Sequence, residues 1–66
     1  MTAAAEQARY NLGAAAQLLR HADPVFAEAV LEGTDHPRAR PILTLVRSRA
    51  IAAAIREIED ALANGG

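Results

Sequence analysis

The 66-residue chain contains no cysteine and no tryptophan, and its only aromatic residues are Tyr10 and Phe26. The absence of cysteine excludes disulfide bonds and thiolate metal sites. The core must therefore be built from aliphatic side chains, and alanine, the commonest residue here, contributes little buried area. A chain of this size buries only about 60% of its unfolded surface and is marginally stable alone. We therefore expect it to form a homo-oligomer.

Lysine is also absent, and seven arginines against eight acidic residues give a formal net charge of −1. Without a basic excess, we do not expect the chain to bind duplex nucleic acid. No apolar run approaches the roughly 20 residues of a membrane span. The N-terminus lacks the basic start and long apolar run of a signal peptide. We therefore expect a cytoplasmic protein without membrane contact.

Two helices are predicted in the first half of the chain. Apolar residues recur at intervals of three and four, which predicts an amphipathic helix over residues 2–21 with Thr2 as its N-cap. Asp23 and Pro24 have the pattern of a cap followed by a first-turn proline, and they predict a short helix over residues 24–32. The apolar side of this short helix contains Val25, Phe26, Ala29, Val30 and Leu31.

A third helix is predicted over residues 38–63, with Pro41 in the first turn, where proline loses no hydrogen bond. The C-terminal part of this helix carries one apolar stripe. In its N-terminal part, called the front below, the apolar residues point around most of the circumference. Because a helix that is apolar all round must be covered all round, we expect the front to lie deep in an assembly. The residues expected at the oligomer interface are Leu12, Leu19, Ile42, Leu45, Val46, Ile51, Ile55 and Ile58.

The predicted fold class is all-α, with one domain over residues 1–66. It is a helical hairpin, with a long first helix, a short second helix and a long third helix. Short connections favour antiparallel packing of neighbours. The hairpin is expected to assemble into a homo-oligomeric helix bundle, and two hairpins forming a four-helix bundle is the simplest closed arrangement.

The sequence contains no recognisable catalytic or metal-binding pattern. Ser48 is the only serine, and His21 and His36 have no acidic or histidine partner at the spacing of a helical metal site. No phosphate-binding glycine loop or dinucleotide fingerprint occurs. We therefore expect no catalytic residue, no metal and no cofactor, and we do not expect an enzyme.

Arginines gather near the start of the predicted last helix, and acidic residues gather near its end. This order opposes the helix dipole, which favours acids at the N-terminus and bases at the C-terminus. Because guanidinium groups bind phosphate bidentately, Arg38, Arg40 and Arg47, with the adjacent Ser48, are candidate anion ligands. Alternatively, two copies of this helix cross antiparallel, and Arg47 and Arg49 contact the acidic residues of the other copy.

Tyr10 lies on a stripe of the first helix that is turned away from its apolar seam. Gly13 and Ala14 leave room beside the ring, and Gln17 and Asn11 are polar neighbours. An aromatic ring with amide partners can stack on a nucleobase and read it. The alternative is that Tyr10 packs against a neighbouring helix in the ordinary way.

These residues resemble the helical-hairpin sponges by which phages sequester cyclic nucleotide signals, namely the anti-CBASS and Thoeris anti-defence hairpin domains. In that family a tyrosine early in the first helix accompanies a turn with proline and arginine and a long alanine-rich second helix. Tyr10-Asn11-Leu12 and residues 37–44 occupy those places, covering about two-thirds of the chain. The resemblance implies an oligomer whose inter-subunit pockets bind cyclic di- or trinucleotides. The segment from Asp23 to Gly33 and the missing aromatic of the second helix depart from the family pattern.

The predicted function is that of a non-enzymatic binding protein. It sequesters a small phosphate-bearing ligand between subunits, with the base on Tyr10 and the phosphates on the arginines. The alternative is a protein–protein interaction module, such as an inhibitor of a host defence enzyme or an antitoxin-like partner. Its contact surface would be the apolar front of the last helix around Ile42, Leu45 and Val46. Helix-turn-helix DNA binding is disfavoured by the near-neutral charge.

Overall fold

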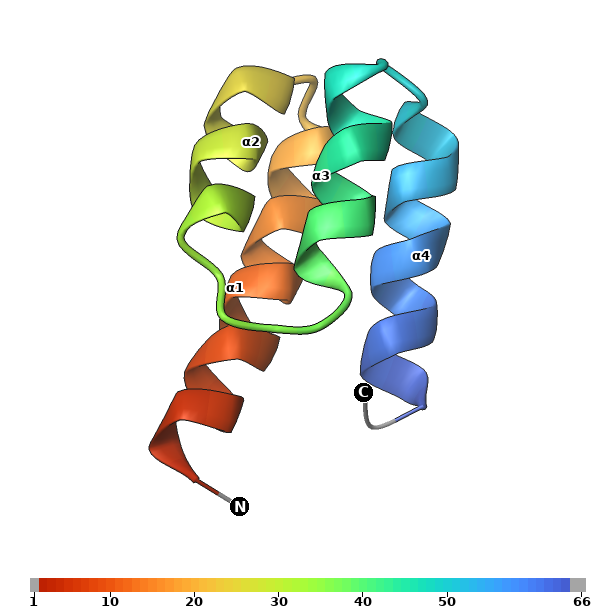
Figure 1. Ribbon diagram of the computed structural model, residues 1–66. Coiled ribbons are helices and arrows are strands. Elements are labelled where there is room, and N and C mark those ends of the chain that lie inside the picture. The colour runs from red at the N-terminus through yellow and green to blue at the C-terminus, as the bar shows by residue number, and fades with distance from the viewer. Residues whose placement is uncertain (1, 65–66) are drawn as a thin grey trace.

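The structure is a computed structural model that describes residues 2–64 (Figure 1). Its four helices are α1 (Ala3–Arg20), α2 (Pro24–Glu32), α3 (Ala39–Arg47) and α4 (Ile51–Ala63). The prediction of an all-α fold is confirmed. The prediction of one continuous helix over residues 38–63 is wrong, because two separate helices, α3 and α4, occupy this stretch.

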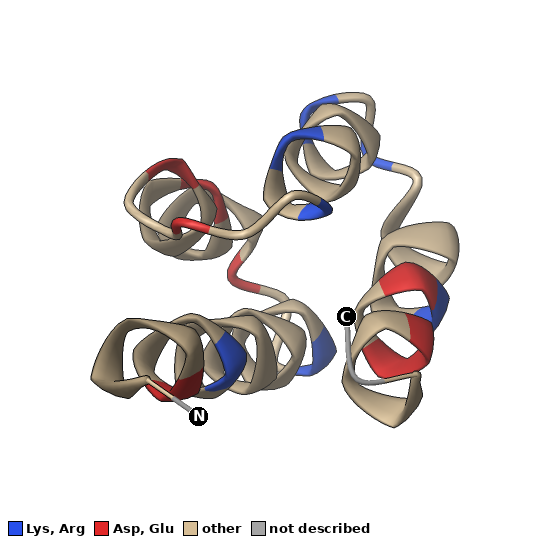
Figure 2. Ribbon diagram, turned by 60° about the horizontal axis from the view of Figure 1, so that its bottom comes forward, with Lys and Arg blue, Asp and Glu red and all other residues tan. Residues whose placement is uncertain are grey.

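The helices run alternately up and down (Figure 1), and Figure 2, turned so that the bottom comes forward, shows them arranged in a ring. α1 packs against α2 and α4, and α3 packs against the same two helices. α1 and α3 are therefore diagonal to each other, as are α2 and α4. One chain thus builds the four-helix arrangement that we expected from two hairpins. None of the described helices combines the length and the apolar composition that a membrane span requires.

Local capping interactions define the start of the first two helices. The hydroxyl of Thr2 accepts a hydrogen bond from the backbone N–H of Ala5 at 3.1 Å. The carboxylate of Asp23 accepts one from the N–H of Phe26 at 3.3 Å, and Pro24 occupies the first helical position. The caps predicted at Thr2 and Asp23 are confirmed, and each satisfies an N–H group that has no partner within its helix.

α1 ends in a Schellman turn, in which one residue adopts a left-handed backbone conformation. The N–H of Ala22 donates to the carbonyl of Leu19 at 3.2 Å, and the N–H of Asp23 donates to that of Leu18 at 2.9 Å. Ala22 has a φ of 59°, which glycine adopts freely and alanine adopts only with strain. The turn reverses the chain so that α2 packs antiparallel on α1.

The strain at Ala22 predicts that Ala22→Gly stabilises the protein by about 0.5–1 kcal/mol. Urea unfolding followed by circular dichroism measures the change. Ala52→Gly, at an exposed position within α4, is the matched control, and it should cost about 1 kcal/mol instead. If both glycines destabilise the protein equally, residue 22 does not have the left-handed conformation.

The same turn separates α3 from α4. The N–H of Arg49 donates to the carbonyl of Val46, and the N–H of Ala50 donates to that of Leu45, both at 2.9 Å. Arg49 takes the left-handed position, with a φ of 60°. No glycine or proline occurs at this break, so the helical pattern of the sequence gives no sign that the helix ends here. The turn folds α4 back against α3 and α1.

The core is formed within the single chain. The buried apolar residues of its main cluster are Leu12, Ala15, Ala16, Leu19, Ala27, Leu31, Ile42, Leu43, Val46, Ala54, Ile58 and Ala61. Five residues expected at an oligomer interface, Leu12, Leu19, Ile42, Val46 and Ile58, belong to this core and are at most 4% exposed. They have almost no surface left for a second copy, so their prediction as an intersubunit contact is wrong for this fold.

The other three expected interface residues, Leu45, Ile51 and Ile55, are partly buried and pack against the same core. The apolar front of the predicted last helix is therefore covered by other helices of its own chain.

Residues 33–38 connect α2 to α3 and are held by short-range hydrogen bonds. The Thr34 hydroxyl donates to the carbonyl of Val30 at 2.6 Å, and its side chain is nearly buried. The N–H of Arg38 donates to Nδ1 of His36 at 3.0 Å, and the N–H of Ala39 donates to the His36 carbonyl at 3.0 Å. These contacts fix where α3 begins and place the Arg38 side chain beside α4.

Candidate functional site

Two of the three arginines expected to bind an anion, Arg47 and Arg38, contact acidic residues of neighbouring helices instead. Arg47 contacts Glu32 at 2.8 Å and Glu28 at 3.9 Å, both on α2. Arg49, beyond the end of α3, also contacts Glu28. In Figure 2 basic residues lie around α3, and acidic residues lie on the helices at either side of it.

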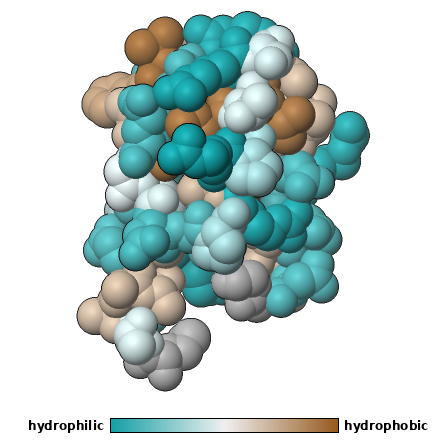
Figure 3. Space-filling model, viewed as in Figure 1, coloured by the Kyte–Doolittle hydropathy of each residue, from teal (hydrophilic) through white to brown (hydrophobic). Residues whose placement is uncertain are grey.

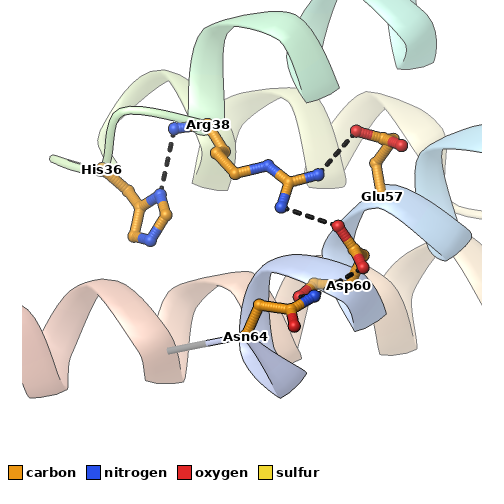
Figure 4. A network of polar contacts seen from close by, with 5 residues as sticks. All are labelled: His36, Arg38, Glu57, Asp60 and Asn64. Atoms are coloured by element: carbon orange, nitrogen blue, oxygen red, sulfur yellow. Dashed lines mark hydrogen bonds and ion pairs between the residues drawn. The ribbon is translucent and has the colours of Figure 1, made fainter. Parts of the chain in front are cut away.

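Arg38 connects the start of α3 to α4 through a hydrogen-bonded network (Figure 4). Its guanidinium donates to Glu57 at 2.7 Å and to Asp60 at 2.9 Å. Asp60 also accepts from the amide of Asn64 at 2.6 Å. The bonds to Glu57 and Asp60 raise the pKa of Arg38 above its ordinary value. Because that stabilisation is lost only in strongly alkaline solution, the Arg38 contribution does not vary with pH near neutrality.

These ion pairs explain the reversed charge order of residues 38–63. Since α4 folds back antiparallel to α3, its acidic C-terminal part lies beside the arginine at the α3 N-terminus. Arg20 of α1 contacts Glu59 on another side of α4. The compensation that we expected from a bound anion or a second copy is thus supplied inside one chain.

Arg40 is different, because it has no ion pair with any described residue. It lies on the wall of a notch of about 360 Å³ between the end of α2, the 33–38 segment and α3. The notch is lined by Leu31, Glu32, Thr34, Asp35, His36, Ala39, Arg40, Leu43 and Arg47. Its wall carries both signs of charge, and its apolar residues come from the edge of the core.

A second hollow lies on the outer side of α1. Tyr10, Gly13, Ala14 and Gln17 line this shallow groove of about 410 Å³. Tyr10 is 72% exposed, more than any other large apolar side chain among the described residues. The prediction that space is left beside the ring is therefore confirmed.

The structure does not bring Tyr10 and the arginines together. Tyr10 lies in the outer groove of α1, whereas Arg40 and Arg47 lie in the notch formed by α3, the helix diagonal to α1. A ligand with its base on Tyr10 and its phosphates on these arginines cannot be held by one chain.

The two remaining candidate ligands also lie apart from these hollows. Asn11 accepts a hydrogen bond from the Gln7 amide at 2.9 Å. Ser48 is exposed at the end of α3, where its N–H donates to the Thr44 carbonyl at 3.0 Å. Neither residue lines the notch or the groove.

Gly13 is not required by the fold of the single chain. A Cβ added at this position meets no atom within 4 Å. Glycine inside a helix costs about 1 kcal/mol relative to alanine, so alanine at position 13 would make the helix more stable. Residue 13 therefore leaves open space on the surface beside Tyr10.

Gly13→Ala should stabilise the isolated chain by about 0.5–1 kcal/mol, because the new methyl group meets free space and lowers the entropy of the unfolded chain. Urea unfolding in dilute solution measures this gain. A loss of stability would show that Gly13 is needed for packing within the chain.

Three residues of the predicted apolar side of α2 are exposed, namely Val25, Phe26 and Ala29. Val25 is 69% exposed and Phe26 is 61% exposed. Figure 3 shows hydrophobic atoms on the surface over the first turn of this helix, while most of the visible face is hydrophilic. The apolar spacing of the sequence could not show which residues of α2 are exposed. The helix has only nine residues, and only Ala27 and Leu31 are buried.

No cluster of three or more histidine, aspartate or glutamate side chains within residues 2–64 is arranged to hold a metal ion. Comparison of the chain with protein-family models, curated proteins and solved structures finds no match. The resemblance to the anti-defence sponges therefore stays a prediction. Any functional proposal depends on the surfaces described above.

Proposed function

We propose that this chain is a non-enzymatic protein-interaction module that binds through the outer face of α1. We define this face by six residues: Glu6, Tyr10, Gly13, Ala14, Gln17 and His21. The observation that carries the proposal is the exposed Tyr10 beside a groove of small residues. Tyrosine is enriched among the residues that dominate binding energy at interfaces, and the spacing of 10, 13, 14 and 17 is that of helix anchors.

The distribution of charge supports this surface. No charged residue occurs from Tyr10 to Leu19, whereas the ion pairs lie between the other helix faces. The centres of protein interfaces are depleted of charge and enriched in aromatic residues. The outer face of α1 has both properties.

This surface replaces the one expected from the sequence. Ile42 and Val46 are fully buried in the core and Leu45 packs against it, so the front of the predicted last helix cannot be the contact surface. The interaction-module hypothesis is kept, but it moves to α1.

The test compares three immobilised baits: the natural chain, Gly13→Arg and Ala52→Arg. Gly13→Arg places a large charge on the outer face of α1, where the chain leaves open space. Ala52→Arg adds the same charge at an exposed position of α4. The proposal predicts that Gly13→Arg loses specific partners, whereas Ala52→Arg retains them. If all three baits retain the same partners, the outer face of α1 is not the binding surface.

A second candidate function is the sequestration of a phosphate-bearing ligand, and Arg40 is the observation that favours it. This guanidinium has no ion pair with a described residue and lies in the notch together with Arg47 and His36. Isothermal titration with a cyclic dinucleotide tests this function. Arg40→Gln should lower the affinity at least about tenfold, as expected for a lost charge-assisted contact. Arg56→Gln, which removes another arginine without an ion pair to a described residue, should leave the affinity unchanged.

A further inference from the structure

The outer face of α1 has a symmetric spacing. Its residues are Glu6, Tyr10, Gly13, Ala14, Gln17 and His21, and the intervals between them are the same when read from either end. The steps of three and four residues keep side chains on one side of a helix, and the single step of one residue, from Gly13 to Ala14, lies at the centre of the row. All six belong to α1 or its C-cap, and all are exposed or partly exposed. The midpoint of the pattern falls between Gly13 and Ala14, where the side chains are smallest.

We propose that this face binds a second copy of the chain, with the two α1 helices crossing antiparallel about a two-fold axis between Gly13 and Ala14. This inference rests on the proposed interaction function and names its partner. A two-fold axis requires one surface to be complementary to itself, so a symmetric row of residues is what such a contact needs.

Reversing the row pairs residues of matching chemistry. Gly13 meets Ala14 of the other copy, which lets the two helix backbones approach closely. Tyr10 meets Gln17, so the ring covers the glutamine stem and the phenol hydroxyl reaches its amide. At the two ends, Glu6 meets His21, whose imidazole N–H donates to the carboxylate.

The electrostatics favour the antiparallel direction. In a parallel pair Glu6 would face Glu6, whereas the antiparallel pair sets each acid beside a histidine. The two arginines of α1 are turned away from this contact. Arg9 donates to the carbonyl of Leu62 at 2.9 Å, and Arg20 contacts Glu59, both on α4.

The size of the surface suits a weak, reversible dimer. The described part of the chain is 32 Å long and 20 Å wide, and the start of α1 projects beyond the other helices (Figure 1). A standard interface takes about 800 Å² from each partner. A contact along one helix is smaller, so we expect a dissociation constant of the order of micromolar.

Analytical ultracentrifugation over a wide range of protein concentration tests the proposal. The natural chain should pass from monomer to dimer, and Ala52→Arg should do the same. Gly13→Arg should remain monomeric throughout, with unchanged circular dichroism, because the Cβ of the new side chain points into open space. A natural chain that stays monomeric at millimolar concentration overturns the proposal, as does a Gly13→Arg dimer as strong as the natural one.

Cysteine cross-linking then tests the direction of the crossing, because the chain has no cysteine of its own. In the antiparallel pair residue 10 lies beside residue 17 of the other copy and about 10 Å along the axis from its own equivalent. A disulfide needs the two Cα atoms within about 7 Å. A mixture of Tyr10→Cys and Gln17→Cys chains should therefore form mixed dimers. Preferential cross-linking of Tyr10→Cys chains to each other would show a parallel pair and contradict the proposal.

The outcomes separate this inference from the proposed function. A natural chain that remains monomeric, while Gly13→Arg still abolishes capture of another protein, overturns only self-recognition. If the natural chain remains monomeric and Gly13→Arg captures the same partners as the natural chain, both proposals are overturned.

Discussion

Replacing Ile58 with alanine should lower the free energy of unfolding by about 2–5 kcal/mol, the cost of a large-to-small substitution in a packed core. Ile58 is fully buried in the cluster formed by all four helices. Since small domains have a total stability of about 5 kcal/mol, the variant should retain at most about 3 kcal/mol, and its urea midpoint should fall accordingly. Urea unfolding followed by circular dichroism measures the loss.

The control for this substitution is Val25→Ala, which shortens an aliphatic side chain that is 69% exposed. It should change stability by less than about 0.5 kcal/mol. The loss at Ile58 should also be independent of protein concentration, because the core lies within one chain. If the effect of Ile58→Ala disappears on dilution, Ile58 belongs to an interface between copies, as the sequence had suggested.

The second large effect is expected at the turn between α3 and α4. Arg49→Pro should destabilise the protein by at least about 3 kcal/mol, for two reasons. Proline requires a φ near −65°, whereas residue 49 has a φ of 60°, and proline also removes the N–H that donates to Val46. Thermal unfolding of the two proteins shows the difference.

Arg49→Gly is the matched variant, because it also removes the side chain that contacts Glu28. Glycine accepts the left-handed conformation, so this protein should stay within about 1 kcal/mol of the natural one. A glycine variant as unstable as the proline variant would contradict the assigned turn.

The first half of the fold was predictable because its signals are local. Thr2, Asp23 and Pro24 each act within one helical turn, and the structure places each in the role that the sequence indicated. The break at Arg49 gives no such signal. There the left-handed conformation is stabilised by the packing of α4 on α3 and α1, a tertiary effect that overrides helix propensity.

The candidate site was predictable to the same limited extent. The sequence placed Tyr10 on a stripe turned away from the apolar seam of its helix, and the structure leaves this side chain exposed. The partners of the arginines were not predictable, because Arg38 meets Glu57 and Asp60 only after the chain folds back. In a continuous helix Arg38 would lie far from Glu57 and Asp60, so the sequence predicted either a bound anion or the acidic residues of another copy as the partner of the arginines.

The fold-back also changes which surface is available for binding. A continuous helix would have exposed its apolar front, whereas the closed bundle buries that front and leaves the outer face of α1 and the start of α2 uncovered. The correction to the secondary structure is therefore what moves the functional hypothesis from the last helix to the first.

The central claim is that one chain closes its own core and presents the outer face of α1 to a partner. An isotope-filtered nuclear Overhauser experiment on a refolded mixture of labelled and unlabelled chains tests it most directly, because it detects only contacts between different molecules. We predict contacts from the Tyr10 ring to Ala14 and Gln17 of another chain, and none between the core methyl groups of α1 and α4. Intermolecular contacts between those core methyl groups would show that α4 completes another chain's bundle, and would contradict the account.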